Sequence, residues 1–132
     1  MNTGESWYRD WRYFAVLALG LLAWALPEPA LRIAWWRLAV LALAEEIVFR
    51  GLLQRELSRV VFLSRRIGPL SLANVLASAV FAAVHLIAQP LVWAAAVFAP
   101  SLIFGWIWDR YQRIAPCWLA HFLFNFWFFY RL

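Results

Sequence analysis

Three charged side chains stand together in an apolar stretch of the sequence. Residues 38–53 contain Glu45, Glu46 and Arg50 and no other charged residue. A charge inside a membrane-spanning helix costs several kcal/mol, so such groups pair, line a wet cavity or serve function. On a helix, Glu46 and Arg50 share a face and can pair, whereas Glu45 lies about 100° away without a local partner. Two adjacent carboxylates in a low dielectric also resist ionising together, which suits one of them to accept a proton.

Further polar side chains lie in two later apolar runs. Phe81 and His85 are four residues apart, as are His121 and Asn125, so each pair shares a helical face. Peptide hydrolysis needs a base beside a water and donors aimed at the developing oxyanion, and a carboxylate, imidazole and amide meet both needs. Packing does not require this many ionisable groups on three helices, and we interpret them as a catalytic site. A structural ion pair is an equally good interpretation of Glu46 with Arg50.

Other polar residues are better explained by structure. Cys117 precedes His121 by four residues and could imitate a thiol–imidazole dyad, but no third orienting group is evident. A free cysteine is often a small buried hydrophobe, and we favour that interpretation. Ser71, Asn74 and Ser78 form a stripe that leads along the third predicted helix toward His85. They line a wet path or hold helices together, and we favour the second.

The composition is that of a membrane protein. Hydrophobic residues make up 66% of the chain, charged residues 14%, and the mean hydropathy is +0.70, which excludes an ordinary soluble domain. All 12 basic residues are arginine. They stand at the ends of apolar segments, so we interpret the net charge of +5 as orientation in a bilayer rather than nucleic-acid binding.

The pattern predicts an all-α polytopic membrane helical bundle of about five transmembrane helices. The expected spans are residues 13–26, 30–53, 69–88, 90–108 and 115–130, with the second continuing as an amphipathic helix through residue 60. The first span covers only ~21 Å at the helical rise, so it borrows from residues 7–12 or thins the bilayer. Pro100 is expected to interrupt the fourth helix. We expect a single domain over residues 1–132, with a catalytic core at about residues 40–126.

Arginine placement predicts the orientation. The loop after the second helix carries Arg55, Arg59, Arg65 and Arg66 against only Glu56, which makes it cytoplasmic by the positive-inside rule. The N-terminus is then cytoplasmic and the C-terminus outside. We expect a bacterial inner (cytoplasmic) membrane protein that keeps its first helix, because no small-residue cleavage site follows it.

Depth provides a check on the site. At a rise of about 1.5 Å per residue, Glu45 lies ~12 Å, His121 ~8 Å and Asn125 ~14 Å from the cytoplasmic ends of their helices. His85 lies ~24 Å deep if its helix starts at residue 69. We therefore expect that helix to start later, with strong tilt as the alternative.

Three motifs stand in order along the sequence. They are Glu45-Glu46-x-x-x-Arg50, Phe81-x-x-x-His85 and His121-x-x-x-Asn125. In this order they resemble the CPBP family (CAAX protease and bacteriocin-processing, Abi), glutamic-type intramembrane proteases that include the Ras-converting CAAX endopeptidase. The resemblance covers about residues 40–126. It implies that Glu45 is the general base, that His85 helps to bind and activate water, and that His121 and Asn125 stabilise the oxyanion.

The resemblance also implies that Glu46 and Arg50 organise the site and that no metal is obligatory. The residues leave a zinc ion open, held by Glu45, His85 and His121. The two histidines lie on different helices without the HExxH spacing that fixes a zinc site locally, so we favour the metal-free interpretation.

We therefore predict an intramembrane endopeptidase that cleaves a small or membrane-anchored peptide or protein by Glu-activated water. Its expected partners are that substrate and the lipid bilayer, with no nucleic acid, and the sequence does not predict an oligomeric state. The alternative is a non-catalytic membrane protein, either a proton or ion relay through the same polar cluster or a degenerate adaptor. A relay needs polar groups on both sides of the site, and the outer helix halves offer almost none.

Overall fold

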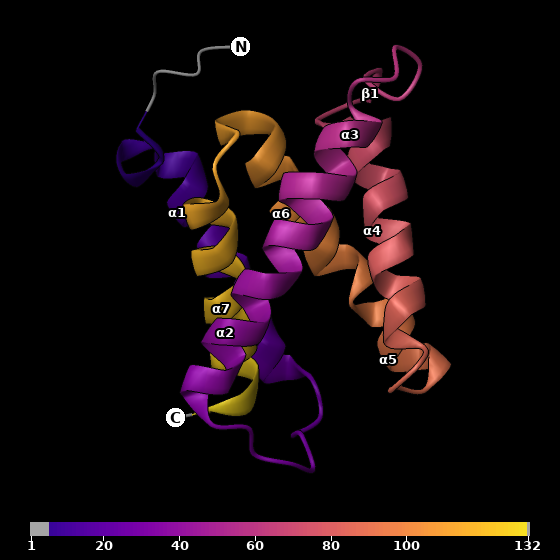
Figure 1. Cartoon of the computed structure of the whole chain (residues 1–132). Helices are drawn as coiled ribbons and strands as arrows, with labels where there is room; N and C mark the ends of the chain where they lie inside the picture. The colour runs from indigo at the N-terminus through magenta and orange to yellow at the C-terminus, as the bar shows by residue number, and fades with distance from the viewer. Residues whose placement is uncertain (1–5, 132) are drawn as a thin grey trace.

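The computed structural model describes residues 6–131 and is built almost entirely of helices (Figure 1). The helices are η1 (Trp7–Arg9), α1 (Trp11–Leu19), η2 (Gly20–Ala25), α2 (Trp35–Glu46), η3 (Ile47–Gln54), α3 (Arg55–Leu57), α4 (Leu72–His85), α5 (Leu91–Ala96), α6 (Phe98–Tyr111) and α7 (Ile114–Phe129). One departure from the all-α prediction is an antiparallel hairpin of β1 (Arg66–Ile67) and β2 (Leu70–Ser71). Gly68 turns this hairpin at φ +60, a conformation that glycine adopts without a Cβ penalty.

The first apolar run begins earlier than residue 13. Asp10 caps α1 by accepting a hydrogen bond from the backbone N–H of Arg12 at 2.9 Å, so the helix starts at Trp11. After Leu19 the backbone tightens into the 3₁₀ helix η2, which rises about 2.0 Å per residue instead of 1.5 Å. The first apolar run is therefore lengthened by its earlier start and by the larger rise of η2.

The second helix starts later than predicted. Helix α2 begins at Trp35, not at residue 30, and continues through η3 and α3 to Leu57. The predicted start is wrong because a tertiary contact holds the preceding segment: the Tyr130 hydroxyl, from beyond α7, donates to the carbonyl of Ile33 at 2.8 Å. The stretch η3 is π-helical. This form is rare in proteins, and where it occurs it is often at a functional site.

The remaining helices follow the predicted breaks. Helix α4 begins at Leu72, where the Ser71 hydroxyl caps the N–H of Asn74 at 3.0 Å, so the expected late start is confirmed. Val97 separates α5 from α6 three residues before Pro100, which has no N–H to donate and interrupts the helix as predicted. Helix α7 agrees with the predicted fifth span within one residue at each end.

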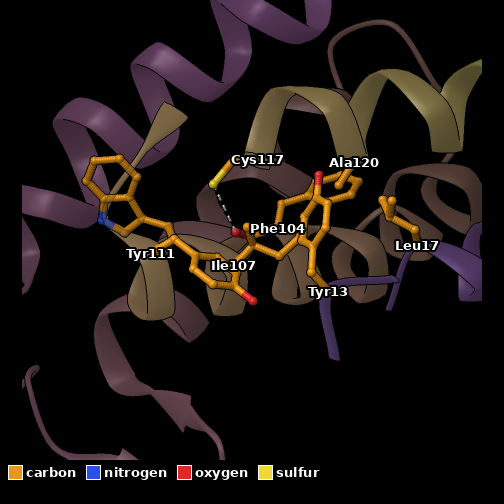
Figure 2. Packing of buried hydrophobic residues seen from close by; sticks show 8 residues of the cluster. Tyr13, Leu17, Phe104, Ile107, Tyr111, Cys117 and Ala120 are labelled. Atoms are coloured by element: carbon orange, nitrogen blue, oxygen red, sulfur yellow. Dashed lines mark hydrogen bonds between the residues drawn. The ribbon is translucent and has the colours of Figure 1, made fainter. Parts of the chain in front are cut away.

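Helix α6 lies between α4 and α7 (Figure 1). It contacts α4 on one side and α7 on the other, α7 also packs against α2 and η2, and η3 packs against α4. Gly105 permits the α4–α6 approach, because a Cβ there would overlap the side-chain amide of Asn74. Buried residues of α1, α6 and α7 form the apolar core shown in Figure 2, including Tyr13, Phe104, Ile107 and Cys117.

Within the described residues, one helix is long and apolar enough by itself to cross a membrane. It is the combined segment Leu91–Tyr111. Three shorter helices are also apolar: Trp11–Ala25, Leu72–His85 and Ile114–Phe129. The number of membrane crossings therefore stays a prediction.

Candidate active site

Glu46 is the centre of the polar cluster. Its side chain is fully buried, and its Oε2 accepts a hydrogen bond from Arg50 Nε at 3.2 Å. Its Oε1 lies 2.8 Å from His121 Nδ1. The predicted Glu46–Arg50 pair is thus present, and both oxygens of the carboxylate are engaged.

His121 is held in one orientation. A carboxylate that accepts from Arg50 acts as an acceptor toward the ring as well, so Nδ1 of His121 carries the hydrogen and donates to Glu46. The ring stacks on Phe104, with centroids 4.6 Å apart and planes 18° apart. These contacts turn Nε2 toward Glu45, whose Oε2 is 3.7 Å away.

Glu45 differs from its neighbour in exposure. Its side chain is 33% exposed, whereas that of Glu46 is 0% exposed. The 3.7 Å separation from His121 is longer than a hydrogen bond. Glu45 is therefore the partly exposed acidic side chain of the cluster, in agreement with its lack of a local partner in the sequence.

His85 lies outside the hydrogen-bonded cluster. Its Nδ1 donates to the carbonyl of Phe81 at 2.8 Å. Its ring contacts that of Phe81 at 4.5 Å, and the Phe81 ring lies 5.9 Å from that of His121. Among the described residues His85 makes no ion pair with Glu45 or Glu46. His85 is the last residue of α4, which begins at Leu72. The later start of this helix therefore does not bring His85 into polar contact with the glutamates.

Asn125 follows His121 by about one turn on α7. Its side chain is half-buried and forms no hydrogen bond within the described part of the chain. Of the six predicted site residues, the structure joins four: Glu45, Glu46, Arg50 and His121.

The sequence interpretation missed other partners of Arg50. Its Nη1 donates to Gln54 Oε1 at 3.0 Å, and its Nη2 donates to Ser101 Oγ at 2.6 Å and to the Ser101 carbonyl at 3.0 Å. Gln54 could have been found, because it continues the four-residue spacing of Glu46 and Arg50. Ser101 comes from a distant helix and carries no such signal.

Helix-joining hydrogen bonds account for Asn74 and Ser78 of the stripe, whereas Ser71 caps α4. Ser101 Oγ donates to Ser78 Oγ at 3.0 Å, and Ser78 Oγ donates to Asn74 Oδ1 at 3.1 Å. Asn74 Nδ2 donates to the Leu102 carbonyl at 3.0 Å. These bonds join α4 to α6, which supports the interpretation that the stripe holds helices together.

Cys117 also has a structural environment. The side chain is fully buried, and its Sγ lies 3.6 Å from the Phe104 carbonyl (Figure 2). The carbonyl of Arg113 lies 3.4 Å from the same sulfur. Its hydrogen bonds thus go to backbone carbonyls, and none joins it to His121 in the described chain. No three His, Cys, Asp or Glu side chains of residues 6–131 are arranged so that they could hold a metal ion.

A protein-family profile described as type II CAAX prenyl endopeptidase Rce1-like matches residues 27–127, most of the chain. The chain belongs to this family. Rce1-like proteins are membrane-embedded peptidases, so the protein is placed among CAAX-type membrane proteases. The Rce1-like match contains every predicted site residue, from Glu45 to Asn125. Neither a curated protein nor a solved structure matched the chain.

Proposed function

We propose that this Rce1-like protein is a glutamic-type intramembrane endopeptidase in which Glu45 activates the attacking water. The observation that supports this most directly is the contrast between two adjacent glutamates. Glu46 is fully buried and hydrogen-bonded through both oxygens, whereas Glu45 is 33% exposed and, within the described residues, has the imidazole of His121 as its ion-pair partner. A general base needs access to water, which a partly exposed carboxylate can have and a fully buried one cannot.

In the proposed reaction, the Glu45 carboxylate takes a proton from water while the hydroxide adds to the carbonyl carbon of the substrate. The imidazolium form of His121 keeps Nδ1–H on Glu46 and points Nε2–H toward the developing oxyanion. Asn125, about one turn away, is a second proposed donor. Glu45 then returns the proton to the leaving amide nitrogen as the C–N bond breaks, which restores the carboxylate.

His85 has a proposed role in holding the water. Its Nδ1–H is held by the Phe81 carbonyl, so Nε2 of the neutral ring can accept a hydrogen bond from water. The chemistry that we propose uses no obligatory metal. Glu45, His85 and His121, the set that the sequence leaves open for zinc, are not arranged to hold a metal ion within residues 6–131.

The proposed setting is a bundle of about five membrane-spanning helices in a bacterial inner membrane. The segment that follows α3 and the N-terminal end of the described chain lie at one end of the molecule, and the C-terminal end lies at the opposite one (Figure 1). An odd number of crossings separates the termini in this way, with the arginine-rich end in the cytoplasm. The proposed substrate is a small or membrane-anchored peptide, and the family description points to a prenylated one.

The substitution Glu45→Gln tests this proposal. Purified protein in liposomes is given a quenched fluorescent peptide that ends in a farnesylated cysteine motif. A parallel sample receives the same peptide without the farnesyl group. We expect the wild type to cleave the farnesylated peptide and Glu45→Gln to lower kcat about 10²- to 10⁴-fold, because the base is lost. The matched control is Glu56→Gln, an exposed carboxylate 57% accessible on α3. Wild-type cleavage by Glu45→Gln would refute the mechanism.

Chelation tests the metal-free part of the proposal. We expect cleavage to persist after exhaustive dialysis against EDTA and phenanthroline. Loss of cleavage that returns on adding Zn²⁺, with metal content measured in the same samples, would replace the glutamic mechanism by a zinc one.

A further inference from the structure

A row of buried polar side chains extends from Glu46 along η3. Glu46, Arg50 and Gln54 follow one another at four-residue steps, and all three are fully buried. Because η3 is π-helical, its turn closes from i to i+5 and is wider than an α turn, which keeps residues four apart on one side. The row ends where Gln54 meets Asp109 of α6.

The amide of Gln54 has only one orientation that fits its neighbours. Arg50 can only donate, so the Gln54 atom 3.0 Å from Nη1 is the carbonyl oxygen Oε1. Its Nε2 then donates to Asp109 Oδ1 at 2.8 Å and to the Gly105 carbonyl at 3.0 Å. Asp109 is 5% exposed, and its Oδ2 is buried without a partner in the described chain. A buried oxygen without a hydrogen bond lowers the free energy of unfolding. A contribution to packing therefore does not by itself explain why a carboxylate stands at this position.

The neutrality of Gln54 matters for Arg50. Within the described residues, the guanidinium has one anionic partner, Glu46, while its contacts with Gln54 and Ser101 are to neutral groups. Charged acceptors form stronger hydrogen bonds than neutral ones. A carboxylate at position 54 would therefore draw Arg50 away from Glu46, which holds His121 through its other oxygen.

We propose that Gln54 and Asp109 are positioning residues for the His121 ring. Gln54 is a neutral acceptor that leaves the charge of Arg50 to Glu46, and Asp109 fixes the direction of the Gln54 amide. The catalytic consequence rests on the proposed function, in which His121 stabilises the oxyanion. The orientation of the ring itself does not depend on that function.

The decisive variant exchanges the acid and the amide. In Gln54→Glu with Asp109→Asn, the new carboxylate can accept from both Arg50 and the new amide, so these two hydrogen bonds and the net charge are kept and only the bond to the Gly105 carbonyl is lost. Protein labelled with ¹⁵N-histidine gives signals from only two rings, since the chain has two histidines. His85, bonded to the Phe81 carbonyl, is the internal control. A Gln112→Glu variant makes the same chemical change at an exposed position near Asp109.

We expect the exchange variant to fold with near wild-type stability, to shift the His121 Nδ1 resonance and to leave the His85 resonances in place. We also expect kcat for the farnesylated peptide to fall roughly 10- to 100-fold with a smaller change in KM, because a small misplacement of a catalytic group is that costly. A purely structural pair predicts otherwise. If Gln54 and Asp109 serve only structure, the exchange variant keeps the wild-type His121 signal and the wild-type kcat. That result would show that our inference is wrong.

A second variant covers failure of the exchange to fold. Asp109→Asn keeps the shape of the side chain but removes the acceptor-only group that sets the amide direction. We expect a smaller shift of the His121 Nδ1 signal than in the exchange variant, and an unchanged signal would overturn the inference. The spectra do not require cleavage, so a wild type that cleaves no peptide would refute the proposed function and leave this test intact.

Discussion

At the scale of single residues, the site depends on how one buried cation is surrounded. Arg50 is fully buried and donates to Glu46, to Gln54 and to two oxygens of Ser101. The planar guanidinium can satisfy acceptors in several directions, which a lysine ammonium cannot match. Arg50 thus joins the acidic helix to α6 as well as fixing Glu46.

Removing Arg50 should destabilise the protein strongly. We expect Arg50→Met to lower the free energy of unfolding by about 3–5 kcal/mol, because Glu46 would remain as an uncompensated buried charge. Unfolding of the purified protein in mixed detergent measures the difference. Arg55→Met, at an exposed position on the next helical segment, is the control and should change stability by less than about 0.5 kcal/mol. Equal stability of the two variants would contradict this account of Arg50.

At the scale of helices, close packing of α4 on α6 brings the polar groups together. The contact places Asn74 and Ser78 against Ser101, which is a ligand of Arg50. It depends on the absence of a side chain at Gly105, since a Cβ there would overlap Asn74. The geometry of Arg50 is therefore linked to Gly105 on α6, although the glutamates lie on α2.

A methyl group at this contact should separate the helices. We expect Gly105→Ala to lower stability by about 1–3 kcal/mol through overpacking, despite the better helix propensity of alanine. Gly51→Ala is the matched control, because its Cβ would meet only the tip of the Ile114 side chain at 3.2 Å. Thermal unfolding of both variants compares them directly. A Gly105→Ala protein as stable as Gly51→Ala would show that α4 and α6 can separate without cost.

A second helix contact predicts a pH effect. Asp10 accepts hydrogen bonds from Arg110 Nε and from the Tyr111 hydroxyl, each at 2.8 Å, and thereby ties α1 to the end of α6. Burial raises the pKa of the Asp10 carboxyl, but hydrogen bonds from the Arg12 N–H, Tyr111 and Arg110, with the charge of Arg110, outweigh it and leave that pKa below its usual value of 3.8. The folded state therefore favours ionised Asp10.

The stabilisation by Asp10 should be present above the unfolded-state pKa and disappear as the pH falls through the lower folded-state pKa. We expect Asp10→Asn to lower the free energy of unfolding at pH 7 by about 1–3 kcal/mol. The gap from wild type should close as the pH falls below about 4. Detergent unfolding curves at several pH values measure it, with the exposed Glu28→Gln as a stability control at neutral pH. A gap that stays constant down to pH 2 would refute the assignment.

At the scale of the whole molecule, the termini and the loops define which end faces which compartment. The loop after α3 and the N-terminal end of the described chain share one end of the molecule, and the turn between α4 and α5 lies at the other with the C-terminal end (Figure 1). Val61 and Ile87 are 81% and 87% exposed in these two loops. The proposed topology assigns the first loop to the cytoplasm and the second to the outside.

Cysteine labelling tests this topology. The chain has a single cysteine, Cys117, which is buried, so Cys117→Ala provides the background. We expect Ile87→Cys to react with a membrane-impermeant maleimide in intact cells, and Val61→Cys to react only after permeabilisation. The reverse pattern would invert the proposed orientation, and labelling of both in intact cells would exclude a single topology.

The sequence alone determined the local features of this protein. The breaks at residues 27–29 and Pro100, the pairing of Glu46 with Arg50 and the lack of a local partner for Glu45 all follow from neighbours within about one helical turn, where spacing fixes geometry. The ordered motifs also sufficed to indicate the family.

The tertiary structure decided what lies across helices. It selected His121 rather than His85 to contact the glutamates, it brought Ser101 and Asp109 to the row on η3, and it held residue 33 outside α2. The physical reason is that such contacts depend on helix rotation, crossing and depth, which side-chain packing sets over the whole fold. Spacing along one helix carries no information about them.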